Sequence, residues 1–212
     1  MLKKYLKKNL KFILAGLGLL ILFYGFSFLV KEDIFTRFDF DMTVRIQAKI
    51  PIRLDAFLSW FSLLGSFEVT LVLLALFSII RRRFHELLLV GIFGFMHVVE
   101  LVGKAFLDHP GTPFMFHRYA LDFFFPTSYV QPGGSYPSGH AMRTAYITII
   151  ILVALSRSKF HKNMKIGIWC LVLGIYIVMI ISRISLGEHW TSDVIGGSLL
   201  GAAFAVFSLI LL

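Results

Sequence analysis

Cysteine and charge are both scarce in this sequence. Cys170 is the only cysteine among 212 residues, which excludes a disulfide within the chain and a metal site built from several cysteines. Because Cys170 lies inside an apolar run, we expect a buried thiol that packs like a small hydrophobic side chain. Charged residues make up only 16% of the chain, whereas a typical soluble domain has about 25%. The chain therefore has too few charges to cover an ordinary soluble domain.

Apolar residues are correspondingly abundant. Hydrophobic residues make up 58% of the chain, and the mean hydropathy is +0.82. The length suits one domain, yet this much apolar surface does not fit inside one water-soluble core. The formal net charge of +9 would suggest a nucleic-acid partner in a soluble protein. Here the positions of the charges point to a membrane instead, so we expect membrane lipids as surroundings and no nucleic acid.

Six apolar segments are long enough to cross a membrane as helices, which takes about 20 residues each. They are residues 12–30, 56–80, 87–107, 138–155, 166–181 and 192–212. The first is too long for the apolar region of a signal peptide and lacks a small-residue cleavage site, so we expect a retained anchor. The sequence therefore predicts an all-α polytopic membrane protein with six transmembrane helices, in a single membrane-embedded domain over residues 1–212.

Lysine and arginine gather in three places that this topology puts on one side of the membrane. They are Lys3, Lys4, Lys7, Lys8 and Lys11 in the tail 1–11, Arg81, Arg82 and Arg83 after the second span, and Arg157, Lys159, Lys162 and Lys165 after the fourth. Basic residues mark the cytoplasmic side. We therefore predict a multi-pass protein of the cell membrane with a cytoplasmic N-terminus. Residues 31–55 and 108–137 are then outer loops.

The outer segment 31–55 carries an ambiguous pattern. Phe38, Phe40, Met42, Val44 and Ile46 alternate with polar residues, which is typical of a strand. A lone strand at a membrane surface would leave its backbone groups unpaired. We therefore expect an amphipathic helix at the interface.

Polar residues that lipid disfavours gather at the outer ends of the last four predicted helices. They are Lys104, Ser138, His140, Arg143, Arg183, His189 and Asp193. A helix bundle would bring these positions together, so we predict an active site at the outer ends of helices 3 to 6.

This set has the chemistry of a phosphate site. Lys104 and Arg183 are fixed cations. Ser138 and Gly139 follow Pro137, which suits the first turn of a helix, where free N–H groups and the helix dipole favour an anion. Two histidines, His140 and His189, are the number needed for phosphoryl transfer through a covalent intermediate, one as nucleophile and one as general acid.

Asp193 comes four residues after His189. On a helix this spacing puts both side chains on one face. The carboxylate can then hold the imidazole tautomer and stabilise the charge that the ring gains, as in a catalytic triad.

Two motifs now carry a resemblance to a known family. Pro137-Ser138-Gly139-His140 resembles the P-S-G-H motif of the type-2 phosphatidic acid phosphatase superfamily, and Ser182-Arg183, five residues, His189, three residues and Asp193 resembles its S-R-x5-H-x3-D motif. The resemblance implies a six-helix lipid phosphate phosphatase. Vanadium haloperoxidases share this site but are soluble, which the composition argues against.

The resemblance also implies roles for single residues. His189 would be the nucleophile that forms phosphohistidine, Asp193 would orient it, and His140 would be the general acid. The phosphate oxygens would be bound by Lys104, Ser138, Gly139 and Arg183. The family needs no metal or other cofactor. Its membership suggests a lipid phosphate substrate, with undecaprenyl diphosphate preferred and phosphatidylglycerophosphate or phosphatidic acid as alternatives.

One family motif is incomplete. The pattern K-x6-R-P begins at Lys104, but Gly111 and Thr112 stand where the arginine and proline belong. Arg118 is our preferred replacement for the missing cation, with His109 and Arg143 as alternatives. Arg143 has a second interpretation, because Glu68 and Glu100 lie within spans and need partners. Glu100 can also pair with Lys104, four residues later.

Other interpretations stay open. His97 and Glu100 resemble half of a metal site, although a hydrogen-bonded core histidine is the more common case. The incomplete motif favours a non-catalytic protein that binds or moves a phosphorylated lipid, whereas the two histidines and Asp193 favour an enzyme. A channel would carry charges at several depths of a pore, but here they gather at one level. The sequence carries no signal for an oligomeric state.

Overall fold

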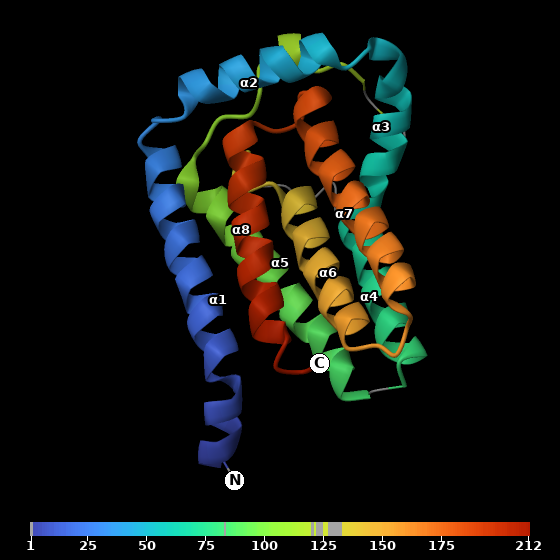
Figure 1. The fold of residues 1–212 in the computed structure, drawn as a ribbon. Helices are drawn as coiled ribbons and strands as arrows, with labels where there is room; N and C mark the ends of the chain where they lie inside the picture. Colours follow the sequence, from blue (N-terminus) through green and yellow to red (C-terminus); the bar gives the residue numbers. More distant parts are fainter. Residues whose placement is uncertain (1, 83, 120, 122–124, 127–132) are drawn as a thin grey trace.

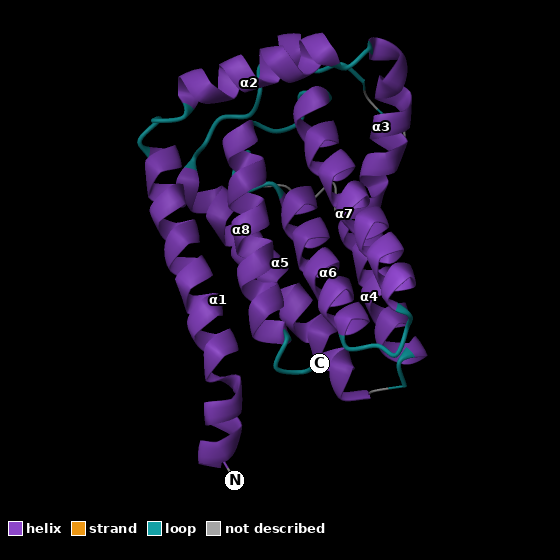
Figure 2. Cartoon of the chain, in the orientation of Figure 1, coloured by secondary structure: helices purple, strands orange, loops and turns teal. Residues whose placement is uncertain are grey.

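The computed structural model describes residues 2–82, 84–119, 121, 125–126 and 133–212. Arg83 and part of the predicted outer loop 108–137 lie outside this range. Within the described residues, every regular element is a helix (Figure 2), which confirms the predicted all-α class.

Eight α-helices follow one another along the described part of the chain. They are α1 (Leu2–Lys31), α2 (Thr36–Lys49), α3 (Asp55–Ser62), α4 (Phe67–Ile80), α5 (Leu88–Leu107), α6 (Gly139–Ser156), α7 (Lys162–Ser185) and α8 (Thr191–Ser208). The long helices run side by side in one bundle, while α2 lies across one end of it (Figure 1). Both chain termini lie at the opposite end.

Five of these helices, α1, α5, α6, α7 and α8, are long and apolar enough to cross a membrane. A sixth span is obtained if α3 and α4, which are bent by 53° at a short break, count as one crossing. The predicted six spans are thus confirmed by length and composition. The predicted span over residues 56–80 is not one continuous helix, because Ser66 adopts an extended conformation before α4. The Gly65-Ser66 pair is a typical place for such a break.

The outer segment forms a helix, as expected, and α2 contacts the rest of the bundle through two side chains. Asp39 accepts hydrogen bonds from the backbone N–H and the hydroxyl of Ser192, at 2.7 and 2.6 Å. Gln47 donates to the carbonyl oxygens of Phe116 and Ser185, at 2.7 and 3.0 Å. These bonds connect α2 to both ends of the α7–α8 turn.

Helices α6 and α8 approach each other at backbone distance. A methyl group added at Gly197 would lie 2.2 Å from the carbonyl oxygen of Ser138, and one at Gly201 would lie 2.1 Å from that of Met142. Only glycine permits this approach, and it places the first turn of α6 against the first turns of α8. In addition, Tyr136 lies just before α6 and exchanges a 2.8 Å hydrogen bond with Ser27 of α1.

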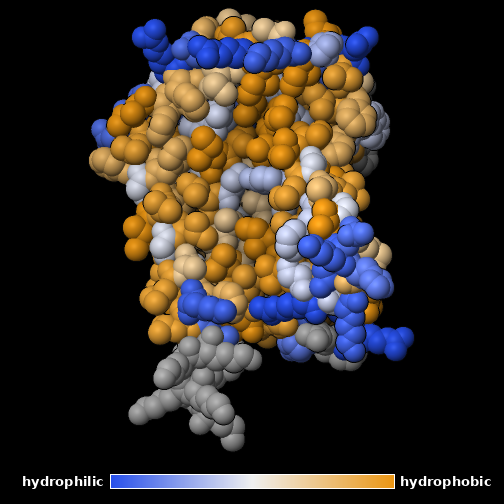
Figure 3. All heavy atoms as spheres, viewed as in Figure 1, coloured by the Kyte–Doolittle hydropathy of each residue, from blue (hydrophilic) through white to orange (hydrophobic). Residues whose placement is uncertain are grey.

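The outside of the bundle is apolar over most of its height. A hydrophobic band separates two hydrophilic rims on the face shown in Figure 3. The prediction that Cys170 is buried is wrong, because its side chain is exposed on α7. Its neighbour Leu171 is 63% exposed. In a span that packs on one side only, an apolar run faces lipid as well as protein.

Candidate active site

The turn between α7 and α8 holds the predicted nucleophile. Gly187 has φ +73°, and a Cβ there would lie 2.1 Å from the carbonyl oxygen of Phe116, so this tight turn requires glycine. His189 follows, with Nδ1 3.3 Å from Oδ2 of Asp193. The expected pairing is present, although His189 precedes the helix and only Asp193 lies in the first turn of α8.

The carboxylate of Asp193 is buried and fully engaged. Oδ2 accepts hydrogen bonds from Ser135 Oγ at 2.5 Å and from the backbone N–H of Trp190 at 2.9 Å, besides its contact with His189. Oδ1 lies 3.0 Å from Nδ1 of His109. Ser135 was not foreseen, and nothing in the sequence around it marks its role.

The P-S-G-H motif forms the start of α6. Ser138 is the N-cap residue, and its Oγ accepts a hydrogen bond from the N–H of Ala141. Pro137 therefore lies just before the N-cap. The sequence had suggested the first turn of the helix instead. The N–H of Ser138 donates to the carbonyl oxygen of Asp193 at 3.0 Å, which ties the two motifs together. The N–H groups of Gly139 and His140 have no partner within the described part of the chain.

The two predicted phosphate-binding cations meet at the histidines. The charges of Lys104 and Arg183 both act on His140 and on His189, although the four residues come from three helices and a turn. In this structure each cation has an acidic partner. Lys104 Nζ lies 3.2 Å from Oε1 of Glu100, and Arg183 pairs with Glu188.

Arg183 has one hydrogen-bond donor without a partner among the described residues. This donor is its buried Nε. A buried guanidinium N–H without a partner is costly. An anion bound at this point would satisfy it.

Arg143 adopts the structural role that was one of its two interpretations. Its Nη1 lies 2.9 Å from Oε2 of Glu100, and its Nε donates to the carbonyl oxygen of Gly65 at 2.9 Å. His97 Nδ1 lies 2.8 Å from the same carboxylate oxygen. The possible metal half-site is thus one end of a buried network in which Glu100 also binds Lys104.

Arg118, the preferred replacement for the missing cation, binds groups other than the predicted catalytic residues in this structure. Its three guanidinium nitrogens bind Oδ2 of Asp55 at 3.0 Å and the carbonyl oxygens of Gln47 and Ile50 at 3.2 and 3.0 Å. This arginine fastens the outer loop to the segment between α2 and α3. Of the three proposed replacements, only His109 contacts a predicted catalytic residue, and it contacts Asp193.

The surroundings of His189 favour the neutral imidazole. Burial is the largest influence and lowers its pKa. Asp193 raises the pKa, and the positive charges of Arg183 and Lys104 lower it again, so that it lies below the ordinary value of 6.5. Most of the imidazole is therefore unprotonated at pH 7. Since Nδ1 faces Asp193, Nε2 is the nitrogen left for attack.

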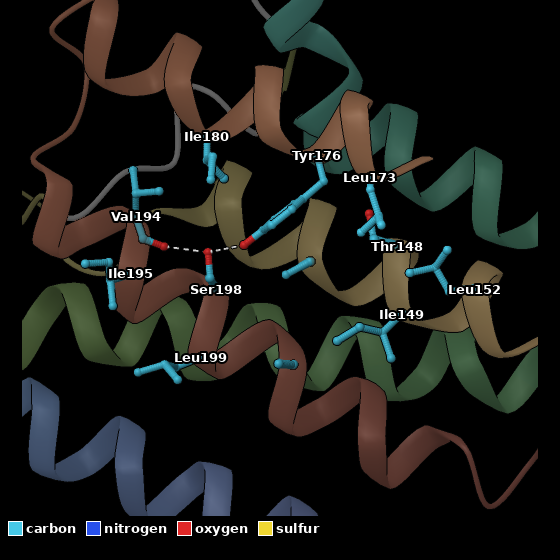
Figure 4. Close-up of a pocket in the computed structure, with 12 residues that line it drawn as sticks. Thr148, Ile149, Leu152, Leu173, Tyr176, Ile180, Val194, Ile195, Ser198 and Leu199 are labelled. Atoms are coloured by element: carbon cyan, nitrogen blue, oxygen red, sulfur yellow. Dashed lines mark hydrogen bonds between the residues drawn. The ribbon is translucent and has the colours of Figure 1, made fainter. Parts of the chain in front are cut away.

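An apolar groove is lined by residues of α6, α7 and α8. Its volume is about 440 Å³, and it is lined at one end by Val194 and Ile180 and at the other by Leu152 and Leu173. Figure 4 shows the groove residues together with the hydrogen bond between Tyr176 and Ser198. Val194, which lines one end of the groove, directly follows Asp193 in α8.

The comparisons with known proteins agree with this geometry. The model of the PAP2 superfamily matches residues 87–212, which include all the motifs described above. The chain belongs to the PAP2 superfamily. The solved PAP2-type phosphatidylglycerolphosphate phosphatase from Bacillus subtilis shares the fold, with a TM-score of 0.73 and 20% identity over 92% of this chain and 94% of that one. Aquifex aeolicus LpxE follows with a TM-score of 0.61 and 21% identity over 81% and 94%.

Two curated relatives match a shorter region. The glucose-6-phosphatase catalytic subunit 1 of Haplochromis xenognathus is 31% identical over 83 residues, which are 35% of this chain and 30% of the relative. The same protein from Haplochromis nubilus matches equally over 24% of its length. The matched region thus spans less than a third of either relative.

Proposed function

We propose that this PAP2 protein is a membrane phosphatase that removes phosphate from a lipid phosphate through a phosphohistidine at His189. The observation that carries the proposal is the pairing of His189 with the buried Asp193, within the field of Lys104 and Arg183 and opposite His140. Binding alone would not need a paired neutral imidazole, so this arrangement favours an enzyme over a lipid-binding protein.

The proposed reaction has two steps. First, Nε2 of His189 attacks phosphorus, an N–P bond forms, and the P–O bond to the lipid breaks while His140 protonates the leaving oxygen. Asp193 stabilises the positive charge on the phosphorylated ring. Water then attacks phosphorus, His140 takes the proton of this water, and the N–P bond breaks to release phosphate and restore His189. No metal is needed for either step.

The phosphate oxygens are proposed to bind Lys104, Arg183, the hydroxyl of Ser138 and the N–H group of Gly139, since the N–H of Ser138 is already bonded to Asp193. The unpartnered Nε of Arg183 and the start of α6 support this placement. Such contacts act most strongly where negative charge develops in the transition state.

The substrate is proposed to be a lipid whose hydrocarbon chain lies along the α6–α7–α8 groove. The groove is apolar and includes Val194, the residue after Asp193, which supports placing the headgroup at His189 and the hydrocarbon chain along the groove. We propose undecaprenyl diphosphate, because the positive-inside rule predicts a site on the outer side of the cell membrane, which suits a carrier lipid. Phosphatidylglycerophosphate is the second candidate, since the Bacillus subtilis structure carries that activity in its name.

The experiment is phosphate release by the detergent-solubilised full chain with EDTA present. We expect activity on lipid phosphates, and loss of at least a thousandfold in His189→Ala, on the order found when a catalytic nucleophile is removed. His161→Ala, on the exposed inner turn, is the matched histidine control and should behave as wild type. Acid-labile radiolabel on the wild-type chain, absent from His189→Ala, would identify the phosphohistidine.

A substrate panel tests the lipid part separately. Undecaprenyl diphosphate, phosphatidylglycerophosphate, phosphatidic acid and glucose 6-phosphate are compared by kcat/KM. A preference for glucose 6-phosphate over every lipid would overturn the lipid assignment. Full activity of His189→Ala would overturn the mechanism, and loss of activity in EDTA would overturn metal independence.

A further inference from the structure

The carboxylate of Asp193 is shared by two histidines. His109 Nδ1 lies 3.0 Å from Oδ1, and His189 Nδ1 lies 3.3 Å from Oδ2. Oδ2 has two further donors, Ser135 and Trp190. Among the described residues, His109 is the only hydrogen-bond partner of Oδ1, so it alone restrains rotation of the carboxylate from that side.

The backbone around His109 is held in place. α5 ends at Leu107, and Asp108 turns the chain with a left-handed conformation at φ +41°. The carbonyl oxygen of His109 accepts from the N–H of Ser135 at 2.9 Å. The next carbonyl, of Pro110, accepts from Nε1 of Trp190 at 2.9 Å. The same two residues that hold Oδ2 thus hold the loop that carries His109.

We propose that His109 is a positioning residue for the nucleophile. It fixes the Asp193 carboxylate through Oδ1 and, by gaining or losing a proton, sets how much of the negative charge of that carboxylate acts on His189. This inference rests on the proposed role of His189 in phosphoryl transfer.

Acidic groups face His109 from three elements. They are Asp193 in α8, Asp39 in α2 and Asp33 in the turn between α1 and α2, while the edge of the Tyr136 ring packs at 6.3 Å. Burial alone lowers the pKa of His109. The hydrogen bond and charge of Asp193, together with Asp39 and Asp33, outweigh burial and raise the pKa above 6.5.

The two histidines therefore respond differently to pH. His189, whose pKa lies below 6.5, remains neutral while His109 is still protonated. A protonated His109 offsets the charge of Asp193 and weakens its support of the phosphorylated His189 ring. When the pH rises through the pKa of His109, this support becomes fully available. The acid limb of the wild-type activity profile should thus report His109 and lie above pH 6.5.

The experiment is the pH profile of kcat/KM, which reports the free enzyme, for the full chain in detergent with phosphatidic acid as the probe substrate. His109→Asn keeps an N–H donor at the position of Nδ1 but cannot titrate. We expect its acid limb to move down by about one pH unit, toward the value that His189 sets. His109→Ala loses the donor, and we expect kcat to fall on the order of tenfold at every pH, as for loss of an outer contact to a site ligand.

His117→Asn is the matched control from the same loop. Its Nε2 lies 3.1 Å from Oγ1 of Thr112, and it makes no contact with Asp193 or His189 among the described residues. We expect its acid limb to coincide with that of the wild type, even if the loop is weakened.

Three results would overturn the inference. They are a wild-type acid limb below pH 6.5, a slower His109→Asn variant whose acid limb has not moved, and a His109→Ala variant with wild-type kcat. The first of these results is measured on the wild type, so it does not depend on whether a variant folds. Failure of the proposed function is a separate outcome, because it requires His189→Ala to remain active. If His189→Ala is inactive while both His109 variants match the wild type, only the role of His109 is overturned.

Discussion

Lys104 and Arg183, the two cations proposed to bind phosphate, differ in how firmly their acidic partners are held. Glu100 is 3% exposed at its side chain and binds Lys104, Arg143 and His97. Glu188 binds Arg183 but is 35% exposed and lies on a turn. Glu188 is therefore the partner that an incoming phosphate can displace, while Glu100 remains part of the framework.

Replacing Glu188 should strengthen anion binding. In Glu188→Gln the carboxylate no longer competes with phosphate for Arg183. Partly exposed ion pairs contribute at most about 1 kcal/mol, so we expect Ki for inorganic phosphate to fall by about threefold. The measurement is competitive inhibition of lipid phosphate hydrolysis. Glu32→Gln, an exposed carboxylate in the α1–α2 turn, is the control. An unchanged or higher Ki in Glu188→Gln would show that the pair does not compete.

At the residue scale, the sequence predicted those contacts that a local spacing determines. His189 and Asp193 lie four residues apart, and Glu100 and Lys104 have the same spacing, so one turn of chain sets each pair. The contacts of Arg118 were not predicted, because its partners are backbone carbonyls and Asp55, which no spacing reveals. Asp39 was missed for the same reason, since 153 residues separate it from Ser192.

At the scale of elements, α2 supplies a capping carboxylate for α8, the helix that carries Asp193. Asp39 accepts from both the N–H and the hydroxyl of Ser192, in the first turn of α8, one residue before Asp193. A carboxylate at this point satisfies a free N–H group and interacts favourably with the helix dipole.

Removing this cap should loosen α8. We expect Asp39→Ala to lower stability by about 1 kcal/mol, the usual effect of losing a cap, and to reduce activity because Asp193 loses its alignment. Thermal inactivation in detergent and kcat are the measurements. Asp41→Ala is the matched control on the same helix, since Asp41 is half exposed and, among the described residues, pairs only with Arg37, at 4.0 Å. Equal effects of the two variants on stability and kcat would show that Asp39 does not stabilise α8 as a cap.

The bend in the second span could not be predicted from the sequence. The apolar run of this span identified a crossing at residues 56–80, but hydropathy averages over the run and does not detect a break. The carbonyl oxygen of Gly65 accepts from Arg143 because the chain bends there. The bend thus contributes to the site through a backbone atom, which a search for polar side chains does not find.

At the scale of the whole molecule, the helix order fixes both termini at the end away from the candidate site (Figure 1). The basic segments Arg81–Arg82 and Arg157–Lys165 lie at that same end of the chain's helices, after α4 and between α6 and α7. The bundle alone does not say which end faces the cytoplasm. The orientation rests on the positive-inside rule and stays a prediction.

Cysteine labelling tests this orientation directly. Because Cys170 is the only cysteine, Cys170→Ala gives a cysteine-free background. Into it we place Ile52→Cys, at a 77% exposed position before α3, or Phe160→Cys, at a 51% exposed position in the α6–α7 turn. We expect a membrane-impermeant maleimide to label the first variant in intact cells and the second only after lysis. The reverse pattern would mean that the site faces the cytoplasm.

The part of the chain that bears the motifs is supported by the part that bears none. Ser27, Asp39 and Gly65 lie in the first three elements and the break after them, and they bind Tyr136, Ser192 and Arg143. Evolution can therefore alter the reactivity of this site while its motifs stay unchanged. The substitutions would lie in α2 or at the break between α3 and α4. Two homologues with identical signatures need not be equally fast or prefer the same pH, and their differences would be found upstream of the signatures.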